Sequence, residues 1–271
     1  MNGIKSKLGA GALALCMILS LAACGTKGEE TPKDEPTPPA ENTETVDTAG
    51  TGAETPEDFG IFTAVAGENG ITYANLFDVI LADRYADYWT AKCAELVGDE
   101  AAPETAAFLR GFISCDIYGQ EAVDAYTDEN FGFDCWYING AEAFTFKDNT
   151  VTIALTDGTE ETHTYDYLGT YRVGEGELMI WGGQEIDPSF ECDVYKSTDD
   201  AGEFTYILLR DDTMETTYHI EFRYGSDLDQ LLTYMDGDYA YWLAAGIDAN
   251  AGEDTIHDVI DLFVTENVAG E

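Results

Sequence analysis

The sequence predicts a mainly β domain of the α+β class, built as an antiparallel β-barrel with flanking helices at its front and its C-terminus. In the middle of the chain, apolar residues alternate with polar ones in short runs separated by turn residues, as in half-buried strands. On both sides of that region, apolar residues recur three and four positions apart, as in helices. Hydrophobic residues make up 45% of the chain, with 13 Phe, 16 Tyr and 4 Trp, so a packed core is expected.

Composition divides the 271 residues into three zones of different charge. Residues 1–24 carry two lysines and no acid, residues 25–58 carry ten acids and two lysines, and residues 59–271 carry 44 acids and eight basic residues. The formal net charge is −42. A polyanion of this size repels nucleic acid phosphates and anionic lipid head groups, which excludes nucleic acid as a partner and makes cations the natural partners.

The first zone has the features of a bacterial export signal. Two lysines precede an apolar run, Leu8–Leu21, that is too short for a comfortable membrane span. The run closes with Leu21-Ala22-Ala23-Cys24, which resembles the lipobox of bacterial lipoproteins, where the cysteine is lipidated. We predict a lipoprotein signal peptide over residues 1–24, lipidation at Cys24 and anchoring to the outer face of the cytoplasmic membrane. The alternative is an ordinary signal peptide with an incidental cysteine.

The second zone, residues 25–58, is predicted to be a disordered acidic linker. It is rich in Thr, Glu, Pro, Gly and Ala, and Val46 is its one large aliphatic residue, so it cannot bury enough apolar surface to fold. A flexible chain of this length reaches roughly 30 Å, which makes it a tether between the membrane and the folded domain.

Residues 59–271 are predicted to form one domain with helices at both ends. The helical front is expected at about 73–126, with one helix from Tyr73 to Leu96 and a second that begins near Pro103, since proline favours the first helical turn. Helices are also expected at about 226–265. The clearest of these has apolar residues at helical spacing, namely Ile256, Val259, Ile260 and Phe263.

Alternating runs predict the barrel at about 134–225. Turn residues, Asp148-Asn149 and Asp157-Gly158, separate its first strands. Eight or so short strands joined by tight turns favour an antiparallel meander that closes into a barrel. After the two runs that begin at Phe144 and Val151, the expected strands lie near His163–Tyr167, Tyr171–Val173, Leu178–Trp181, Phe190–Tyr195, Phe204–Leu209 and Tyr218–Tyr224.

Four cysteines remain in the domain: Cys93, Cys115, Cys135 and Cys192. An exported protein meets conditions that permit disulfides, and four cysteines allow three pairings, among which the sequence does not choose. Because no CxxC pair occurs, a cysteine-rich zinc site is not expected.

Of the three histidines, His219 is the most informative. The two-residue period of its strand places Thr217, His219, Glu221 and Arg223 on one face and apolar residues on the other. An imidazole and a carboxylate side by side are both competent ligands for one cation. The simpler interpretation is a solvent-facing polar row in which Glu221 pairs with Arg223. His257 is expected to be a solvated helix residue, and His163 a hydrogen-bonded barrel residue.

Several short segments also occur in the order and spacing of a known family. They are Asp148-Asn149-Thr150-Val151, Tyr165-Asp166-Tyr167-Leu168-Gly169-Thr170-Tyr171, Phe190-Glu191-Cys192, Asp200-Ala201-Gly202-Glu203-Phe204-Thr205-Tyr206, and Met235-Asp236 with Tyr239 and Tyr241. Together they resemble the ZinT/YodA zinc-binding domain, which also occurs fused to zinc-uptake lipoproteins. The resemblance covers a little over half of the 59–271 domain, and the helical front matches only faintly.

The resemblance implies a lipocalin-like barrel, extracytoplasmic zinc binding and delivery to a metal-uptake transporter. The family binds zinc through three histidines, one in a turn and two in a strand. Here Asp212 stands at the turn position and His219 and Glu221 at the strand pair, or Thr217 and His219 in the alternative register. We take Asp212, His219 and Glu221 as the predicted ligands. The family's paired cysteine is also altered, because His163 stands where the partner of Cys192 would be.

The altered ligand set bears on the choice of metal. An Asp, His and Glu set is harder than three histidines, so it shifts preference from Zn²⁺ toward Mn²⁺, Mg²⁺ or Ca²⁺. Zn²⁺ remains the predicted metal, with Mn²⁺ or Ca²⁺ as alternatives.

Three functions therefore compete. The first is a membrane-anchored divalent-metal-binding lipoprotein whose affinity depends on His219. The second is a lipocalin-like barrel with a degenerate metal site that binds a small apolar ligand or a surface partner, which the many aromatic residues favour. The third is an enzyme, but none of the common nucleophile, phosphate-loop or metalloprotease motifs occurs in the sequence, so no catalytic residue is predicted.

Overall fold

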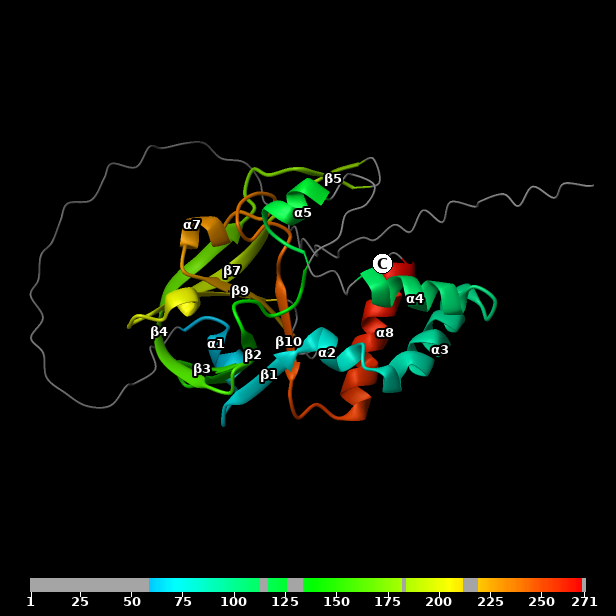
Figure 1. The fold of residues 1–271 in the computed structure, drawn as a ribbon, viewed down its shortest axis with the longest axis horizontal. Helices are drawn as coiled ribbons and strands as arrows, with labels where there is room; N and C mark the ends of the chain where they lie inside the picture. Colours follow the sequence, from blue (N-terminus) through cyan, green and yellow to red (C-terminus); the bar gives the residue numbers. More distant parts are fainter. Residues whose placement is uncertain (1–58, 113–116, 126–133, 182–183, 212–218, 270–271) are drawn as a thin grey trace, which may run out of the picture.

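The computed structural model describes residues 59–112, 117–125, 134–181, 184–211 and 219–269. The predicted signal peptide, Cys24, the linker, Cys115 and Asp212 lie outside the described residues. The described part consists of a barrel and a layer of helices beside it (Figure 1).

Eight strands of the described residues form a closed antiparallel barrel, which confirms the predicted fold class. Around the barrel the strands follow the order β1-β10-β9-β8-β7-β4-β3-β2. They are β1 (Ile71–Asn75), β2 (Ala141–Lys147), β3 (Thr150–Leu155), β4 (Glu160–Val173), β7 (Phe190–Ser197), β8 (Tyr206–Arg210), β9 (His219–Gly225) and β10 (Ala244–Asp248). Two further strands, β5 (Met179–Trp181) and β6 (Gln184–Ile186), pair as a separate ribbon.

The strands from β2 to β9 follow the predicted alternation and turns. Asp148 lies in the β2–β3 turn at φ 52°, and Gly158 lies in the β3–β4 turn at φ 86°, so both turns use residues that tolerate positive φ. Two details differ from the prediction. The two strands expected at His163–Tyr167 and Tyr171–Val173 form the single strand β4, which carries a register shift between Tyr167 and Gly169. The strand expected at Leu178–Trp181 is β5, which lies in the separate ribbon and not in the barrel.

The strands that close the barrel, β1 and β10, lie outside the range predicted for it. Tyr73, expected to begin a helix, lies in β1, and β10 falls within the segment predicted to be helical. The alternation is absent from β10 because both of its faces are buried: Ala244 packs in the barrel core, and Ala245 and Ile247 pack against the helices. Gly246 is required there, since a Cβ would lie 2.4 Å from the Tyr137 hydroxyl.

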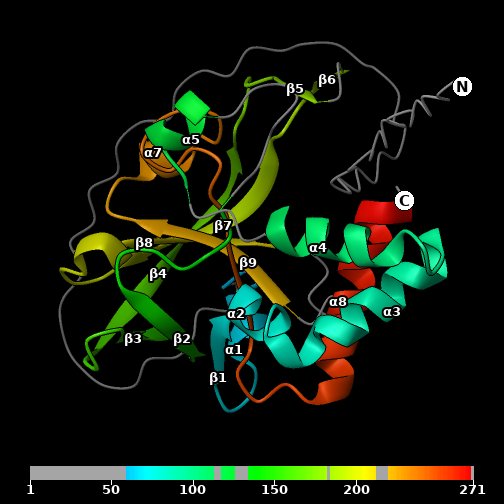
Figure 2. The same cartoon turned by 45° about the vertical axis from the view of Figure 1, so that its right-hand side comes forward.

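The helical layer packs on the outside of β10. Figure 2 shows its helices α3 (Ala86–Val97), α4 (Ala102–Phe112) and α8 (Glu253–Ala269) together on one side of the barrel. Its core includes Trp89 and Cys93 from α3, Leu109 from α4 and Ile260 from α8. The predicted apolar stripe of the last helix is confirmed, as is the helix that begins near Pro103. The helices are α1 (Phe62–Ala66), α2 (Leu76–Ile80), η1 (Asp83–Tyr85), α3 (Ala86–Val97), α4 (Ala102–Phe112), α5 (Gln120–Ala125), η2 (Gly202–Phe204), α7 (Leu228–Leu231) and α8 (Glu253–Ala269).

No helix of the described ranges combines the length and the apolar character that a membrane span requires.

Aromatic side chains fill the barrel. Phe144 contacts Phe222 and Tyr224 at ring-centroid distances of 5.0 and 4.9 Å, and Phe62 contacts Tyr195 at 5.1 Å. All five side chains are buried. Many of the aromatic residues of the sequence therefore pack in the barrel core.

Candidate metal site

Strand β9 carries the residue on which the metal prediction depends. His219 is its first residue and pairs in register with Ile247 of β10. His219 and Glu221 are half-buried, whereas Ile220 and Phe222 are buried, so this part of the strand follows the predicted two faces. His219 and Glu221 therefore lie side by side on one face, as the sequence predicts.

Glu221 forms an ion pair with Arg210, not with Arg223. Arg210 lies on β8 directly opposite Glu221 in the sheet register, and its Nη1 lies 2.5 Å from Oε2 of Glu221. Only 14% of the Arg210 side chain and 19% of the Glu221 side chain are exposed, so solvent screens this pair weakly. The expected pairing of Glu221 with Arg223 is wrong because the cross-strand neighbour is closer than the next residue on the same face.

Arg223 is fully buried, which corrects its predicted place in a solvent-facing row. Its guanidinium donates hydrogen bonds to backbone carbonyls that follow β9 in the chain: Leu231, Thr233 at 3.0 Å and Tyr239 at 2.6 Å. Its charge also lies over the ring of Trp242 at 6.0 Å. Burial lowers the pKa of Arg223 to about 10, so it remains charged at neutral pH. Arg223 ties the α7 region to the barrel.

The described residues do not complete the predicted ligand set. Asp212 and Thr217 lie outside them, so Asp212 stays a prediction. Within the ranges described, no group of three or more His, Cys, Asp and Glu side chains is arranged to hold a metal ion. His219 and Glu221 therefore supply two of the three proposed ligands, and Glu221 is engaged by a guanidinium.

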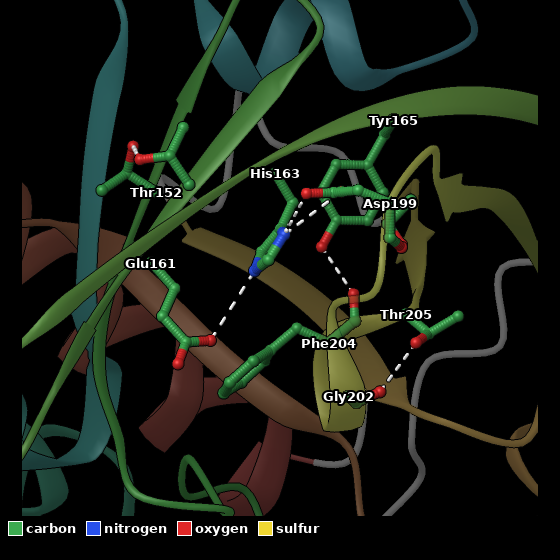
Figure 3. A network of polar contacts seen from close by, with 10 residues as sticks. Thr152, Glu161, His163, Tyr165, Asp199, Gly202, Phe204 and Thr205 are labelled. Carbon is green, nitrogen blue, oxygen red and sulfur yellow. Dashed lines mark hydrogen bonds and ion pairs between the residues drawn. The ribbon is translucent and has the colours of Figure 1, made fainter.

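His163 lies in a separate polar cluster (Figure 3). Its Nδ1 lies 3.1 and 3.2 Å from the two carboxylate oxygens of Asp199, and its Nε2 lies 3.6 Å from Oε2 of Glu161. The prediction of a hydrogen-bonded barrel residue is confirmed. The sequence did not reveal its partner Asp199, which lies 36 positions away and meets it only because β4 pairs with β7.

The structure also describes Cys192 and His257. Cys192 pairs in register with Tyr171. Cys192 is buried, and burial raises the pKa of its thiol to about 12. His257 is not simply solvated, because its ring stacks on Tyr88 with centroids 3.7 Å apart and planes 5° apart.

A surface cavity of about 340 Å³ lies near the start of β2. Its lining is largely polar, with Asp78, Glu142, Asn75 and Thr156 beside Trp136, Tyr137 and Ala141. Burial raises the pKa of Asp78. This cavity does not suit the apolar ligand of the alternative function, and the aromatic side chains of the core occupy the barrel interior.

The chain therefore belongs to the class of closed antiparallel barrels with flanking helices. Known structures include two that are similar to it. No protein-family profile and no curated protein match the sequence. The structure is similar to the Zn(II)-bound ZinT-like domain of Streptococcus pneumoniae AdcA, with a TM-score of 0.43 and 13% identity over 74% of this chain and 93% of that domain. It is also similar to Zn(II)-bound AdcA from Streptococcus pneumoniae, with a TM-score of 0.42 and 14% identity over 71% of this chain. The match spans 33% of the length of that AdcA chain. Similarity at this level gives no information about ligand or function.

Proposed function

We propose that this chain is a divalent-metal-binding lipoprotein, anchored through Cys24 on the outer face of the cytoplasmic membrane, that contributes to metal capture or homeostasis. The observation that carries the proposal is the pair His219 and Glu221, side by side and half-buried on a barrel strand. The 44 acidic and eight basic residues of the 59–271 domain surround this pair with a field that concentrates cations. It is proposed as a binding protein, without a catalytic role.

The metal must compete with Arg210 for Glu221. A divalent cation carries twice the charge of the guanidinium and gains the His219 nitrogen as a further ligand, which Arg210 cannot use. The displaced guanidinium has an acceptable position, because it already lies over the Phe190 ring at 5.3 Å. Asp212 is the proposed third ligand, and that assignment rests on the sequence resemblance alone.

Zn²⁺ is the proposed metal because it accepts a mixed set of one imidazole and two carboxylates in tetrahedral geometry. The same set also suits Mn²⁺, and Ca²⁺ prefers oxygen ligands only, so it ranks below both. A metal-uptake transporter is the proposed recipient of the ion, since a tethered binding protein can pass its cargo to a neighbour in the same membrane.

The primary test is calorimetric titration of metal-stripped protein with Zn²⁺ at physiological salt, beside His219→Ala and His257→Ala. His219→Ala should lose one stoichiometric site, and His257→Ala should keep it, because that imidazole stacks on Tyr88 away from β9. Weak heats of many sites, equal in all three proteins, would identify a polyanion that collects counterions and would refute the proposal.

Arg210→Gln provides a second test with the opposite sign. Removal of the competing guanidinium frees Glu221, so Zn²⁺ affinity should rise by about tenfold, the equivalent of one partly buried ion pair of about 1.4 kcal/mol. Glu221→Gln should lower the affinity. Equal affinity in Arg210→Gln and the parent protein would remove Glu221 from the ligand set.

A further inference from the structure

The cluster around His163 lies beside one face of β4. His163 pairs in register with Val151, and Glu161 pairs with Ile153. Val151 and Ile153 are fully buried in the barrel core, and residues opposite each other in a sheet point to the same face. Glu161 and His163 therefore share one face of β4 near its start, beside the η2 turn that carries Phe204 (Figure 3). His163 is buried there, whereas the Glu161 side chain is 47% exposed.

Asp199 determines which nitrogen of His163 carries the proton. A carboxylate only accepts hydrogen bonds, so Nδ1 donates its proton to Asp199 across 3.1 Å. An imidazole that carries its one proton at Nδ1 presents a lone pair at Nε2. This arrangement, a carboxylate on one ring nitrogen and an open lone pair on the other, is the one that metal-bound histidines use to fix their orientation.

The Nε2 atom has no hydrogen-bond partner among the described residues, although His163 is only 8% exposed. Its neighbour is Oε2 of Glu161 at 3.6 Å. A lone pair that faces a carboxylate is repulsive unless a positive charge lies between them. A charge-assisted hydrogen bond from an imidazolium would require about 2.7–2.9 Å. Two ligands of one tetrahedral zinc ion, each at 2.0–2.2 Å, lie about 3.4 Å apart, which is close to the separation in the structure.

The surrounding residues supply no competing fixed cation. In the described part of the chain, the ion pairs of Glu161 and Asp199 are with His163 only, and neither carboxylate pairs with a lysine or arginine. This differs from Glu221, which Arg210 neutralises. The Glu161 side chain is 47% exposed and the Asp199 side chain 55%, so a cation beside the buried imidazole can keep water ligands, and no lysine or arginine of the described residues competes with it there.

We infer that His163 Nε2 and the Glu161 carboxylate hold one divalent cation, of the Zn²⁺ or Mn²⁺ class, with Asp199 as the positioning residue and water as the remaining ligands. This site is separate from the proposed His219 site, and neither depends on the other. Both protein ligands lie at the start of β4, and the hydrogen bond from His163 to Asp199 links them to the turn after β7.

The test uses the full chain, purified in detergent, stripped of metal and titrated with Zn²⁺. His219→Ala is the background, so that the site on β9 does not contribute. In this background one site should remain. Glu161→Gln and His163→Gln should each weaken it by at least tenfold, and Asp199→Asn by 10- to 100-fold, the range expected for loss of a group that orients a metal-bound histidine. Glu160→Gln, an exposed neighbour on the other face of β4, is the matched control and should bind as the background does.

A spectroscopic measurement distinguishes metal binding from a structural role. In protein labelled with ¹⁵N at histidine, Zn²⁺ should shift the Nε2 resonance of His163 while Nδ1 keeps its proton, and Glu161→Gln should abolish that shift without loss of the fold. Equal Zn²⁺ affinity in the Glu161→Gln, Glu160→Gln and background proteins would overturn the inference. A proton that stays on Nε2 when Zn²⁺ is added would overturn it as well. If His219→Ala by itself abolishes all Zn²⁺ binding, this inference is refuted and the proposal for β9 stands.

Discussion

Strands β4 and β9 both place charged side chains in the wall of the barrel, but they neutralise them differently. On β9 the chain supplies its own cations, since Arg210 pairs with Glu221 and Arg223 lies buried against backbone carbonyls. Among the described residues, the carboxylates of Glu161 on β4 and of Asp199 in the turn after β7 form ion pairs with the imidazole of His163 and with no lysine or arginine. A metal ion must therefore displace a guanidinium on β9, whereas on β4 it meets acceptors without such a competitor.

The difference teaches that two charged residues on one strand face do not by themselves define a metal site. The net charge around the pair decides whether an added cation stabilises it or competes with one already there. His219 and Glu221 match a ligand pattern in sequence, yet the cross-strand neighbour changes their chemistry. His163 matches no ligand pattern in the sequence, yet its Nε2 has no hydrogen-bond partner among the described residues.

The largest expected effect is the loss of stability at high pH, which comes from buried tyrosines on both strands and beside them. Burial raises the pKa of Tyr165 on β4 and Tyr224 on β9, and burial with the nearby Glu203 carboxylate raises that of Tyr239 to about 12. The folded protein then keeps tyrosine protons that the unfolded chain loses near pH 10, so the free energy of unfolding falls as pH rises above 10. Each such tyrosine contributes a slope of about 1.4 kcal/mol per pH unit, so several together should unfold the barrel before pH 12.

Urea unfolding at pH 8, 10 and 11, together with tyrosinate absorbance, checks this expectation. Tyrosinate from both strands should form in one step that coincides with unfolding. Gradual ionisation near pH 10 in a folded protein would contradict it. The variants Tyr165→Phe and Tyr224→Phe assign the absorbance to each residue. If Tyr165 ionises at a lower pH than Tyr224, the β4 side of the barrel unfolds first.

Arg223→Met tests how much the buried guanidinium of β9 contributes to the stability of the fold. Burial of its charge costs about 3 kcal/mol, judged from the lowering of its pKa from 12.5 to about 10. The substitution removes the guanidinium donor from three backbone carbonyls, two of them buried, at about 1–3 kcal/mol each, and this loss exceeds the relief of desolvation. We expect a decrease of about 2–4 kcal/mol in the free energy of unfolding, measured by urea denaturation at pH 7.

Arg210→Met is the control for that measurement, and it should cost about 1.4 kcal/mol, the value used above for this partly buried ion pair. A stabilised Arg223→Met protein would mean that desolvation outweighs the carbonyl hydrogen bonds, and that the two arginines do not differ as proposed.

Local sequence signals predict the parts of the fold that depend on neighbouring residues. The alternation of β2 and β3, the turn at Gly158 and the stripe of α8 are all visible in the chain, because periodicity and turn chemistry act over a few positions. Strand β10 is not visible, since a strand buried on both faces reads as an uninterrupted short apolar run. The closure of the barrel therefore follows only from the structure.

The candidate sites were less predictable than the fold because their partners are distant in sequence. The strand period gives the faces of His219 and Glu221, but only the β8–β9 register brings Arg210 to Glu221. Arg223 shares the period of His219, yet the segment after β9 folds back over it and supplies its carbonyl acceptors. A pattern on one strand indicates direction, and the neighbouring elements determine burial and charge.

The smallest expected effect is on β4, where the hydrogen bond between His163 and Asp199 should contribute about 0.5–1 kcal/mol without metal. Asp199→Ala removes that bond and should lower the free energy of unfolding by this amount in EDTA, as measured by urea denaturation at pH 7. Glu161→Gln should change it little, since its carboxylate is too far from Nε2 for a hydrogen bond. With Zn²⁺ both substitutions should cost more, because Glu161→Gln then loses an ion ligand and Asp199→Ala loses the group that orients one. If Glu161→Gln is equally stable with and without Zn²⁺, and so is the parent protein, β4 carries a structural histidine and its contrast with β9 lies in packing alone.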